Sequence, residues 1–322
     1  MDAQVIVRQA RPDDRDGVVA FTRDTWPDRG SDYIPRVFDE WVETDGPRQR
    51  TLVAEVDDEP VGICQGVLLS THEAWGQGMR VHPDHRGSDV SRALSEAVFG
   101  WARRQGATVF RSMVFSWNAA GLGHARSVGY EPVCEFRWVH PEPDDDANAT
   151  GAEPGRTDSG FVSAPDLEVL VDPDPAVAWS AFHGSRAYRE LAGLGLDLEE
   201  SWALSELSPD RLGEADRTLV VADAERTRGM TYRVRTFDRE DADSEDDSEV
   251  VTWAEYGVGT WEDHEALRAL AAAVSRDAAS VGAEEVRMLV PETPRHVSDA
   301  AYARLGLSDE PDFVMERDLT RC

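Results

Sequence analysis

Residues 85–94, HRGSDVSRAL, join an extended segment that ends at Val81 to a stretch with helical periodicity. Apolar residues recur at helical spacing from Val90 onward, which predicts a helix over residues 90–105. The backbone N–H groups of a tight loop and the positive end of a helix dipole together hold phosphate groups. Gly87 suits such a loop because glycine tolerates unusual dihedral angles and leaves room for close approach.

Asp89 places a negative charge where a phosphate-binding loop favours glycine. A carboxylate about 5 Å from one phosphate charge costs roughly 3 kcal/mol at an effective dielectric constant near 20. Concentrated salt removes much of this cost if the side chain points to water. The backbone donors do not depend on side-chain identity, so the aspartate weakens a phosphate site without excluding it.

The elements that must position this loop follow from periodicity and turn residues. They are a strand at 4–9, helices at 12–23 and 34–44, a hairpin of strands 52–56 and 61–69, a strand at 75–81, the helix at 90–105, a strand at 108–115 that we expect to be buried, a helix at 118–128 and a strand to 139. A helix that joins neighbouring strands in this way implies a mixed sheet with a parallel section. The expected fold class is α/β.

Two segments of the sequence repeat one pattern. GATVFRSMV at 106–114 resembles GAEEVRMLV at 282–290, and each follows an alanine-rich amphipathic helix. ARSVGY and YARLGL lie downstream of these segments with the glycine at the same place. The two halves are therefore predicted to be copies of one fold.

The first half resembles the GNAT acyltransferases, in which acetyl coenzyme A (acetyl-CoA) supplies an acetyl group to an amine. The resemblance rests on VHPDHRGSDVSRALSEAV, TVFRSMVF and NAAGLGHARSVGYEP, which follow the family's order of a V-x-P strand end, a glycine loop, a helix, a strand and a second helix. The second half fits in its order of elements but lacks the loop motif. The resemblance implies two tandem GNAT folds, each a mixed, partly parallel sheet flanked by helices.

The resemblance also implies where acetyl-CoA binds. The pantetheine arm would lie between the strands at 77–81 and 108–115, and the loop backbone would hold the phosphates. The implied cofactor-binding residues are Met79, Val81, Arg86, Gly87, Ser88, Asp89, Val90, Ser91 and Asn118. An alternative role for Asn118 is to cap its own helix.

The family often uses a tyrosine four residues before a glycine as the acid for the thiolate, and Ala125 occupies that place here. The same count from Gly306 in the second half gives Tyr302. Together with Tyr302, the candidate catalytic residues are His124, His72 and Glu73, of which His124 has a structural role as its alternative. The candidate acceptor residues are Trp26, Asp32 and Tyr33, for which core packing or a lid is the alternative.

Two acidic stretches of low complexity, at 140–160 and 238–249, lack the apolar residues that would offset the entropy of ordering. The first is expected to be a linker and the second a long loop. The predicted domains are residues 1–140, which would bind acetyl-CoA, a linker at 141–160, and a degenerate GNAT-like domain at 161–322.

The net charge of -30 arises from 63 acidic residues against 33 basic residues, and every basic residue is an arginine. This charge favours adaptation to concentrated salt over an acidic surface for one partner, because the acidic residues are spread along the whole chain. It disfavours nucleic acid as a partner. The three cysteines are too scattered for a disulfide framework or a metal site, and the sequence shows no secretory signal or membrane span, so a soluble cytoplasmic protein is expected.

The leading functional hypothesis is an acetyl-CoA-dependent N-acetyltransferase that acts on an amine of a small molecule or a peptide, with no metal. The alternative is a non-catalytic protein, either an acyl-CoA sensor or a scaffold. The sequence leaves the acceptor and the oligomeric state open. An open gap between the strands that end at Val81 and begin at Thr108 would favour cofactor binding, whereas side chains that fill the gap would favour a scaffold.

Overall fold

The computed structural model of the protein describes residues 4–23, 25–26, 32–147, 167–240 and 250–321. The chain forms two compact units. Unit 1 comprises Met1–Pro132 together with Val314–Cys322, and unit 2 comprises Val133–Phe313. Most of the expected linker, at 148–160, and most of the second acidic stretch, at 241–249, lie outside the described residues.

Unit 1 contains a mixed sheet in which β1 to β4 are antiparallel neighbours and β5 pairs with β4 in parallel. Its elements in chain order are β1 (Ile6–Gln9), the 3-10 helix η1 (Pro12–Asp14), α1 (Arg15–Thr22), α2 (Ile34–Glu43), β2 (Gln49–Val56), β3 (Glu59–Leu68), β4 (Glu73–Val81), η2 (Pro83–His85), α3 (Val90–Arg104), β5 (Val109–Phe115) and α4 (Ala119–Ser127). The strand β16 (Asp312–Asp318) places most of its residues in unit 1. The N–H of Leu319, just after it, donates to the carbonyl of Thr108 at 2.8 Å.

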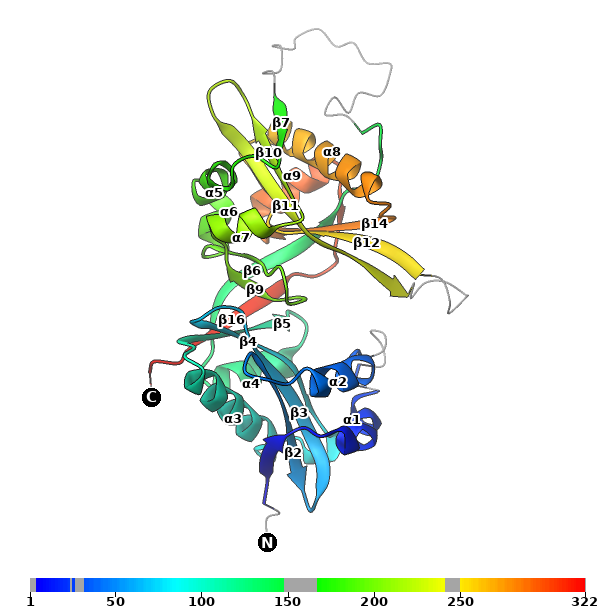
Figure 1. The fold of residues 1–322 in the computed structure, drawn as a ribbon, viewed down its shortest axis with the longest axis vertical. Coiled ribbons are helices and arrows are strands. Elements are labelled where there is room, and N and C mark those ends of the chain that lie inside the picture. Colours follow the sequence, from blue (N-terminus) through cyan, green and yellow to red (C-terminus); the bar gives the residue numbers. More distant parts are fainter. Residues whose placement is uncertain (1–3, 24, 27–31, 148–166, 241–249, 322) are drawn as a thin grey trace. The chain divides into compact units, whose positions relative to one another are not determined.

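Helices cover both faces of the unit 1 sheet (Figure 1). A Cβ atom on Gly62 or Gly66 of β3 would lie within 3 Å of side chains of α3, so α3 packs directly on the backbone of this strand. The alternate residue Ile63 is fully buried in a cluster with apolar residues of α1 and α2. Because successive side chains of a strand point to opposite faces, α3 lies on one face and α1 with α2 on the other.

Unit 2 also contains a mixed sheet, in the order β7-β10-β11-β12-β14-β6, and only the β12–β14 pair of this series is parallel. Its elements in chain order are β6 (Glu131–His140), which begins in unit 1, β7 (Glu168–Val171), α5 (Pro175–His183), α6 (Arg186–Glu190), β8 (Leu194–Leu196), β9 (Leu204–Glu206), α7 (Pro209–Glu214), β10 (Arg217–Ala222), β11 (Thr227–Glu240), β12 (Val250–Tyr256), β13 (Thr260–Trp261), α8 (His264–Ser280), β14 (Glu285–Pro291), α9 (Pro294–Tyr302) and β15 (Gly306–Leu307).

The core of unit 2 forms where α8 packs on this sheet. Small residues dominate the buried face of α8, and they let the helix approach Leu219, Ala254 and Met288 of three strands closely. The predicted fold class, α/β with mixed and partly parallel sheets flanked by helices, is confirmed. Among the helices that the structure describes, none has both the length and the apolar character needed to span a lipid bilayer.

Candidate cofactor and active site

The parallel pairing of β4 with β5 is short. The ladder covers only Glu73–Trp75 of β4 against Val109–Arg111 of β5, although β4 continues to Val81 and β5 to Phe115. The strands therefore separate after Trp75. Beyond this residue the N–H and C=O groups of β4 and β5 that face the gap no longer pair with one another. The expectation that all of the segment 108–115 is buried was wrong, because Ser112–Phe115 lie along this gap and are only half-buried.

A β-bulge bends β4 beside the gap. Ile63 and Gln65 of β3 pair with Arg80 and Gln77 of β4, so two residues of β4, Gly78 and Met79, lie opposite one residue of β3. Gly78 has a φ of +66°, and a Cβ atom there would lie 2.5 Å from the indole of Trp41. Sequence reasoning missed this bulge. The signal was a glycine within the strand segment WGQGMRV, since glycine inside a strand often marks a bulge.

The loop between β4 and α3 presents free donors. In the described chain, the backbone N–H groups from Gly87 to Arg92 make no hydrogen bond. Gly87 has a φ of +81°, and no atom lies within 4 Å of the position that a Cβ would take. The loop leads into the N-terminus of the 15-residue helix α3, where the dipole favours negative charge. This geometry suits an anion such as a pyrophosphate.

Asp89 has a backbone conformation that glycine adopts without strain. It is the N-cap of α3 with a φ of 59°, in the left-handed region that aspartate tolerates better than most residues. Its side chain is 86% exposed, and the carboxylate lies 3.5 Å from Nε of Arg92. Arg86 is also exposed at the surface of the loop. The carboxylate therefore faces water, where salt screens it effectively.

The structure brings the three predicted acceptor residues together around Arg80 of β4. Oδ2 of Asp32 lies 2.6 Å from Nε of Arg80, and the two side chains are 0% and 9% exposed. The Arg80 guanidinium lies 4.1 Å from the ring centre of Trp26 and 5.6 Å from that of Tyr33. Oδ1 of Asp32 also accepts the N–H of Ile34 at the start of α2. The buried ion pair thus fixes the entry to α2 against β4.

Aromatic rings connect this group to the end of β5. The ring of Trp26 meets Phe115 edge-on at 5.8 Å and Trp117 edge-on at 5.4 Å. Phe115 and Trp117 stack at 5.1 Å with nearly parallel planes. Trp26, Phe115 and Trp117 therefore form an aromatic wall near the ends of β4 and β5 at which the strands are separated.

The separated strands, the free loop and this wall all lie within a segment that matches a known family. Residues 15–130 match the sequence model of the Acetyltransferase (GNAT) family. The solved GCN5-related N-acetyltransferase from Sphaerobacter thermophilus is similar over 98% of this chain and 96% of its own, at 14% identity and a TM-score of 0.57. The chain has the GNAT fold.

Another solved structure agrees with this assignment of the GNAT fold. A putative acetyltransferase from Thermoplasma acidophilum is similar over 97% of this chain and 99% of its own, at 18% identity and a TM-score of 0.52. No curated protein matches this sequence.

The short helix α4 places two predicted residues of the GNAT site. Asn118 is its N-cap, and Oδ1 accepts the N–H of Gly121 at 2.9 Å, so the side chain serves the capping role. Nε2 of His124 lies 3.0 Å from Oγ of Ser95 on α3. Burial and, to a smaller extent, the positive charge of Arg92 hold the pKa of His124 below its usual value. The imidazole is therefore neutral near pH 7 and able to accept a proton.

Ala125 occupies the position that the sequence analysis assigned to the acid, and Tyr130 is a nearby tyrosine. Ala125 is buried and carries no proton to donate. The Tyr130 hydroxyl lies 3.0 Å from Oγ of Ser112 on β5. Burial raises the pKa of Tyr130, so its phenol stays protonated.

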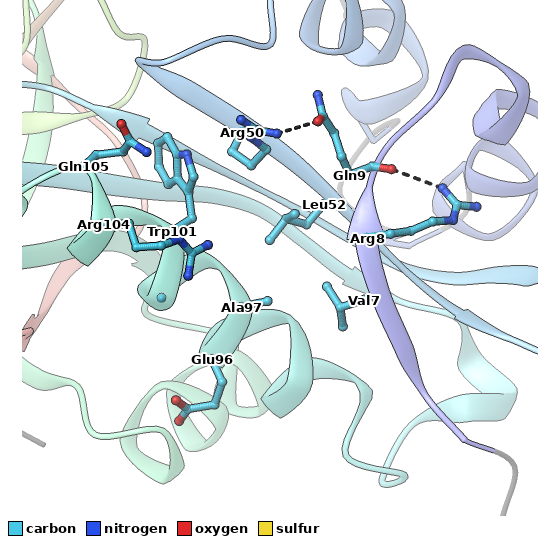
Figure 2. A pocket seen from close by; sticks show the side chains of 11 residues that line it. Val7, Arg8, Gln9, Arg50, Leu52, Glu96, Ala97, Trp101, Arg104 and Gln105 are labelled. Atoms are coloured by element: carbon cyan, nitrogen blue, oxygen red, sulfur yellow. Dashed lines mark hydrogen bonds between the residues drawn. The ribbon is translucent and has the colours of Figure 1, made fainter.

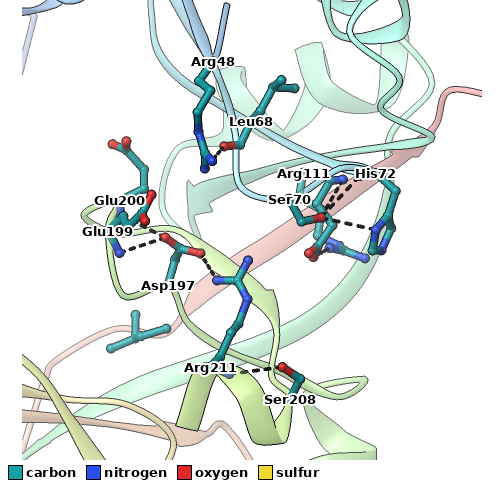
Figure 3. A network of polar contacts seen from close by, with 12 residues as sticks. Arg48, Leu68, Ser70, His72, Arg111, Asp197, Glu199, Glu200, Ser208 and Arg211 are labelled. Carbon is teal, nitrogen blue, oxygen red and sulfur yellow. Dashed lines mark hydrogen bonds and ion pairs between the residues drawn. The ribbon is translucent and has the colours of Figure 1, made fainter. Parts of the chain in front are cut away.

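Glu73 and His72 lie where β4 begins, at the closed end of the gap. Glu73 is 1% exposed, and Oε1 accepts a hydrogen bond from Nη1 of Arg111 at 2.6 Å. Arg111 also pairs with Glu316 of β16 through Nε at 2.7 Å. Nδ1 of His72 lies 3.3 Å from Oγ of Ser70 (Figure 3). The Glu73 carboxylate thus belongs to a buried ion-pair network in unit 1.

The corresponding part of unit 2 is closed. After the parallel ladder of β12 and β14, the N–H of Gly259 still donates to the carbonyl of Leu289 at 2.7 Å. Asp263 is the N-cap of α8 and accepts the N–H of Ala266 at 3.0 Å. Burial alone would raise the pKa of Asp263, but this hydrogen bond and the Arg228 guanidinium hold it below its usual value. A carboxylate of the chain itself therefore sits at this helix N-terminus.

Tyr302 ends α9 of unit 2 and is 61% exposed. Its ring lies 4.6 Å from the imidazole of His264 and 5.3 Å from the guanidinium of Arg268. The phenol is therefore placed on the surface of unit 2, against the first turns of α8.

Proposed function

We propose that unit 1 binds acetyl-CoA and transfers its acetyl group to an amine. The observation that carries the proposal is the separation of β4 from β5 after Trp75, next to a loop whose N–H groups are free. A scaffold would gain stability by continuing the ladder and by capping the helix, as unit 2 does with Gly259 and Asp263. Unit 1 does neither.

The residues of unit 1 fit the cofactor that the fold implies. The N–H groups from Gly87 to Arg92 would hold the phosphates, with the Arg86 guanidinium beside them. The backbone of Met79 and Val81, beyond the end of the ladder, offers hydrogen-bonding groups to the pantetheine amides. When bound, acetyl-CoA supplies an activated thioester.

The acceptor amine would approach beside Trp26 and Tyr33. Asp32 is already neutralised by Arg80, so it does not provide a free carboxylate for an ammonium group. The aromatic wall of Trp26, Phe115 and Trp117 provides apolar contact and a face for a cation. These side chains would orient the amine, and orientation alone can lower the barrier by several kcal/mol.

The amine must lose a proton in order to attack, and His124 is our first candidate to take part in that transfer. Its imidazole is neutral near pH 7 because burial and Arg92 lower its pKa. Glu73 is a weaker candidate because Arg111 holds its carboxylate in a buried pair. His72, which contacts Ser70, and Tyr302, which contacts His264, remain further candidates.

The second candidate function is an acyl-CoA-binding protein without turnover. Ala125 favours it, because the position that often carries the family's acid has no ionisable group. One experiment distinguishes the two functions. Amines are incubated with the protein and acetyl-CoA, and the products are identified by mass spectrometry. Binding with no acetylated product across a broad amine panel would favour the sensor.

We further propose that unit 2 is a degenerate copy of the unit 1 fold that does not bind the cofactor. Both sheets contain an antiparallel series followed by one parallel strand, and the sequence segments at 106–114 and 282–290 correspond. We also propose that the net charge of -30 reflects adaptation to a salt-rich environment. Calorimetric titration with acetyl-CoA in molar KCl tests the function of unit 1, and absence of both heat and thermal stabilisation would refute it.

A further inference from the structure

A pocket lies in unit 1 between α3 and the strands β1 and β2, away from the gap between β4 and β5. It has a volume of about 520 Å³ and is lined by β1, β2 and the C-terminal half of α3 (Figure 2). A volume of this size is within the range of small-molecule sites. The pocket begins near Glu96, whereas the phosphate-binding loop precedes Val90 at the other end of α3.

The lining of this pocket is basic in a strongly acidic chain. Arg8 is neutralised, because it pairs with Asp14 at 2.8 Å and with Glu55 at 2.6 Å. Arg50 and Arg104 also line the pocket, and neither forms an ion pair in the part of the chain that the structure describes. Nη1 of Arg50 donates to Oε1 of Gln9, which is an uncharged acceptor, so this contact leaves the charge of Arg50 uncompensated.

The one acidic residue that lines the pocket is Glu96. Its side chain is 52% exposed, and its carboxylate lies 3.9 Å from Nη1 of Arg317. It therefore does not neutralise Arg50 or Arg104 by direct contact. Three arginines and one glutamate line the pocket, and the carboxylates of Asp14, Glu55 and Asp45 act on Arg8 and Arg50 from outside the lining.

Two buried donors in this pocket have no acceptor. Nε1 of Trp101 and Nε of Arg50 are buried, and neither makes a hydrogen bond in the described chain. Trp101 is only 4% exposed, and Figure 2 shows its indole nitrogen on the side of Arg50. An unsatisfied buried donor destabilises a protein, so each of these is a place where an acceptor oxygen would stabilise it.

Part of the remaining lining is apolar, beside the polar side chains of Gln9 and Gln105. Val7, Leu52 and Ala97 contribute aliphatic surface to the pocket (Figure 2). A ligand that covers this surface needs an apolar body as well as an anionic group. Inorganic ions alone would leave it in contact with water.

We propose that this pocket binds a small organic anion, a carboxylate or phosphate ester with a short apolar body. Oxygens of the anion would accept from Arg50, Arg104 and the indole N–H of Trp101. Asp89 and Trp101 are separated by about 18 Å along α3 at 1.5 Å per residue. The anion and acetyl-CoA can therefore bind at the same time, and the assignment of this pocket does not depend on the proposed function.

Calorimetry and thermal unfolding of the full chain test this proposal with phenylacetate, phenyl phosphate, inorganic phosphate and the uncharged 2-phenylethanol. We expect at least one of the two organic anions to bind and stabilise the protein, with and without saturating acetyl-CoA. Phenylacetate and phenyl phosphate distinguish a carboxylate site from a phosphate site. Stabilisation by neither organic anion would overturn the proposal.

Variants locate the site. Arg50→Gln and Arg104→Gln should each weaken binding of the organic anion about tenfold, as loss of a charged hydrogen bond predicts. Trp101→Phe removes the N–H donor and keeps most of the ring, and Ala97→Phe fills the pocket. Arg103→Gln, on an exposed neighbour that does not line the pocket, is the matched control and should bind as the wild type does. Equal affinity in all these variants, or loss of binding in Gly87→Ala instead, would contradict the assignment.

Discussion

Asp32 and Arg80 form a buried ion pair with a separation of 2.6 Å between Oδ2 and Nε, and this pair joins the segment before α2 to the bulged strand β4. Asp32→Ala leaves the guanidinium buried without a partner, so the free energy of unfolding should fall by about 3–5 kcal/mol. Denaturant unfolding at constant salt measures the change.

A matched control for this pair is Asp39→Ala. Asp39 pairs with Arg15 at 2.9 Å, but the two side chains are 57% and 43% exposed. Exposed pairs contribute at most about 1 kcal/mol, so this variant should be nearly as stable as the wild type. Equal losses for the two variants would mean that burial of the Asp32 pair does not matter.

Asp89 should set the salt dependence of cofactor affinity. Asp89→Gly removes the carboxylate and allows the left-handed φ of 59° without strain. We expect acetyl-CoA to bind about tenfold more tightly to this variant in dilute buffer and almost equally to both proteins at 1 M salt, because screening shortens the Debye length to about 3 Å. Titration of both proteins across a KCl series measures the effect.

Asp89→Asn separates charge from backbone conformation. Asparagine tolerates the left-handed region as aspartate does, so it should reproduce most of the gain at low salt. If Asp89→Asn bound no better than the wild type while Asp89→Gly did, the cost would lie in the backbone and the electrostatic account would be wrong.

Asp312 should make the stability of the protein depend on pH near neutrality. Burial raises the pKa of this carboxyl group to about 7. Between about pH 4 and pH 7 the folded chain therefore holds this proton while the unfolded chain releases it. Over this range the group lowers the stability of the protein progressively as pH rises, and above about pH 7 the loss is complete. The difference in the free energy of unfolding between Asp312→Asn and the wild type should be about 2–4 kcal/mol more favourable to the variant at pH 8 than at pH 4.5.

The measurement for Asp312→Asn is the thermal midpoint as a function of pH, with Glu285→Gln as the control. Glu285 is exposed on β14, so its replacement should shift the midpoint by a small amount that is the same at every pH. A constant difference between Asp312→Asn and the wild type would show that the carboxyl group ionises normally in the folded protein.

The net charge of -30 predicts that removal of salt destabilises the fold. We expect the thermal midpoint to rise steadily with KCl over the molar range. Sucrose at matched osmolarity is the control, because it does not screen charge. Full stability in dilute buffer would contradict the proposal of adaptation to salt.

Local sequence signals predicted much of unit 1. The expected helices at 34–44 and 90–105 correspond to Ile34–Glu43 and Val90–Arg104, and the hairpin lies within two to three residues of its expected limits. These elements have strong periodicity and clear turn residues, which act locally. The loop between β4 and α3 was located for the same reason, and its role in phosphate binding stays a prediction.

Features that depend on tertiary pairing were not predicted. The resemblance implied a gap between these two strands, but the residue at which the β4–β5 ladder ends, Trp75, leaves no periodic trace. The pair of Arg80 with Asp32, 48 residues apart, leaves none either. The grouping of Val314–Cys322 with unit 1 depends on the return of the chain after residue 313, whereas the sequence analysis placed all residues after 160 in the second half. The bulge at Gly78 had a signal that was not used.

Calorimetric titration of the full chain with acetyl-CoA in molar KCl tests the central claim most directly, with Gly87→Ala and Gly282→Ala as paired variants. Both glycines have positive φ, at +81° and +72°, and open space around them, so alanine imposes comparable strain at each. We predict one binding site per chain, weakened strongly by Gly87→Ala and unaffected by Gly282→Ala, because Gly87 lies in the loop with free N–H groups before α3 whereas Gly282 follows the end of α8. Absence of binding, or equal loss in both variants, would contradict the account.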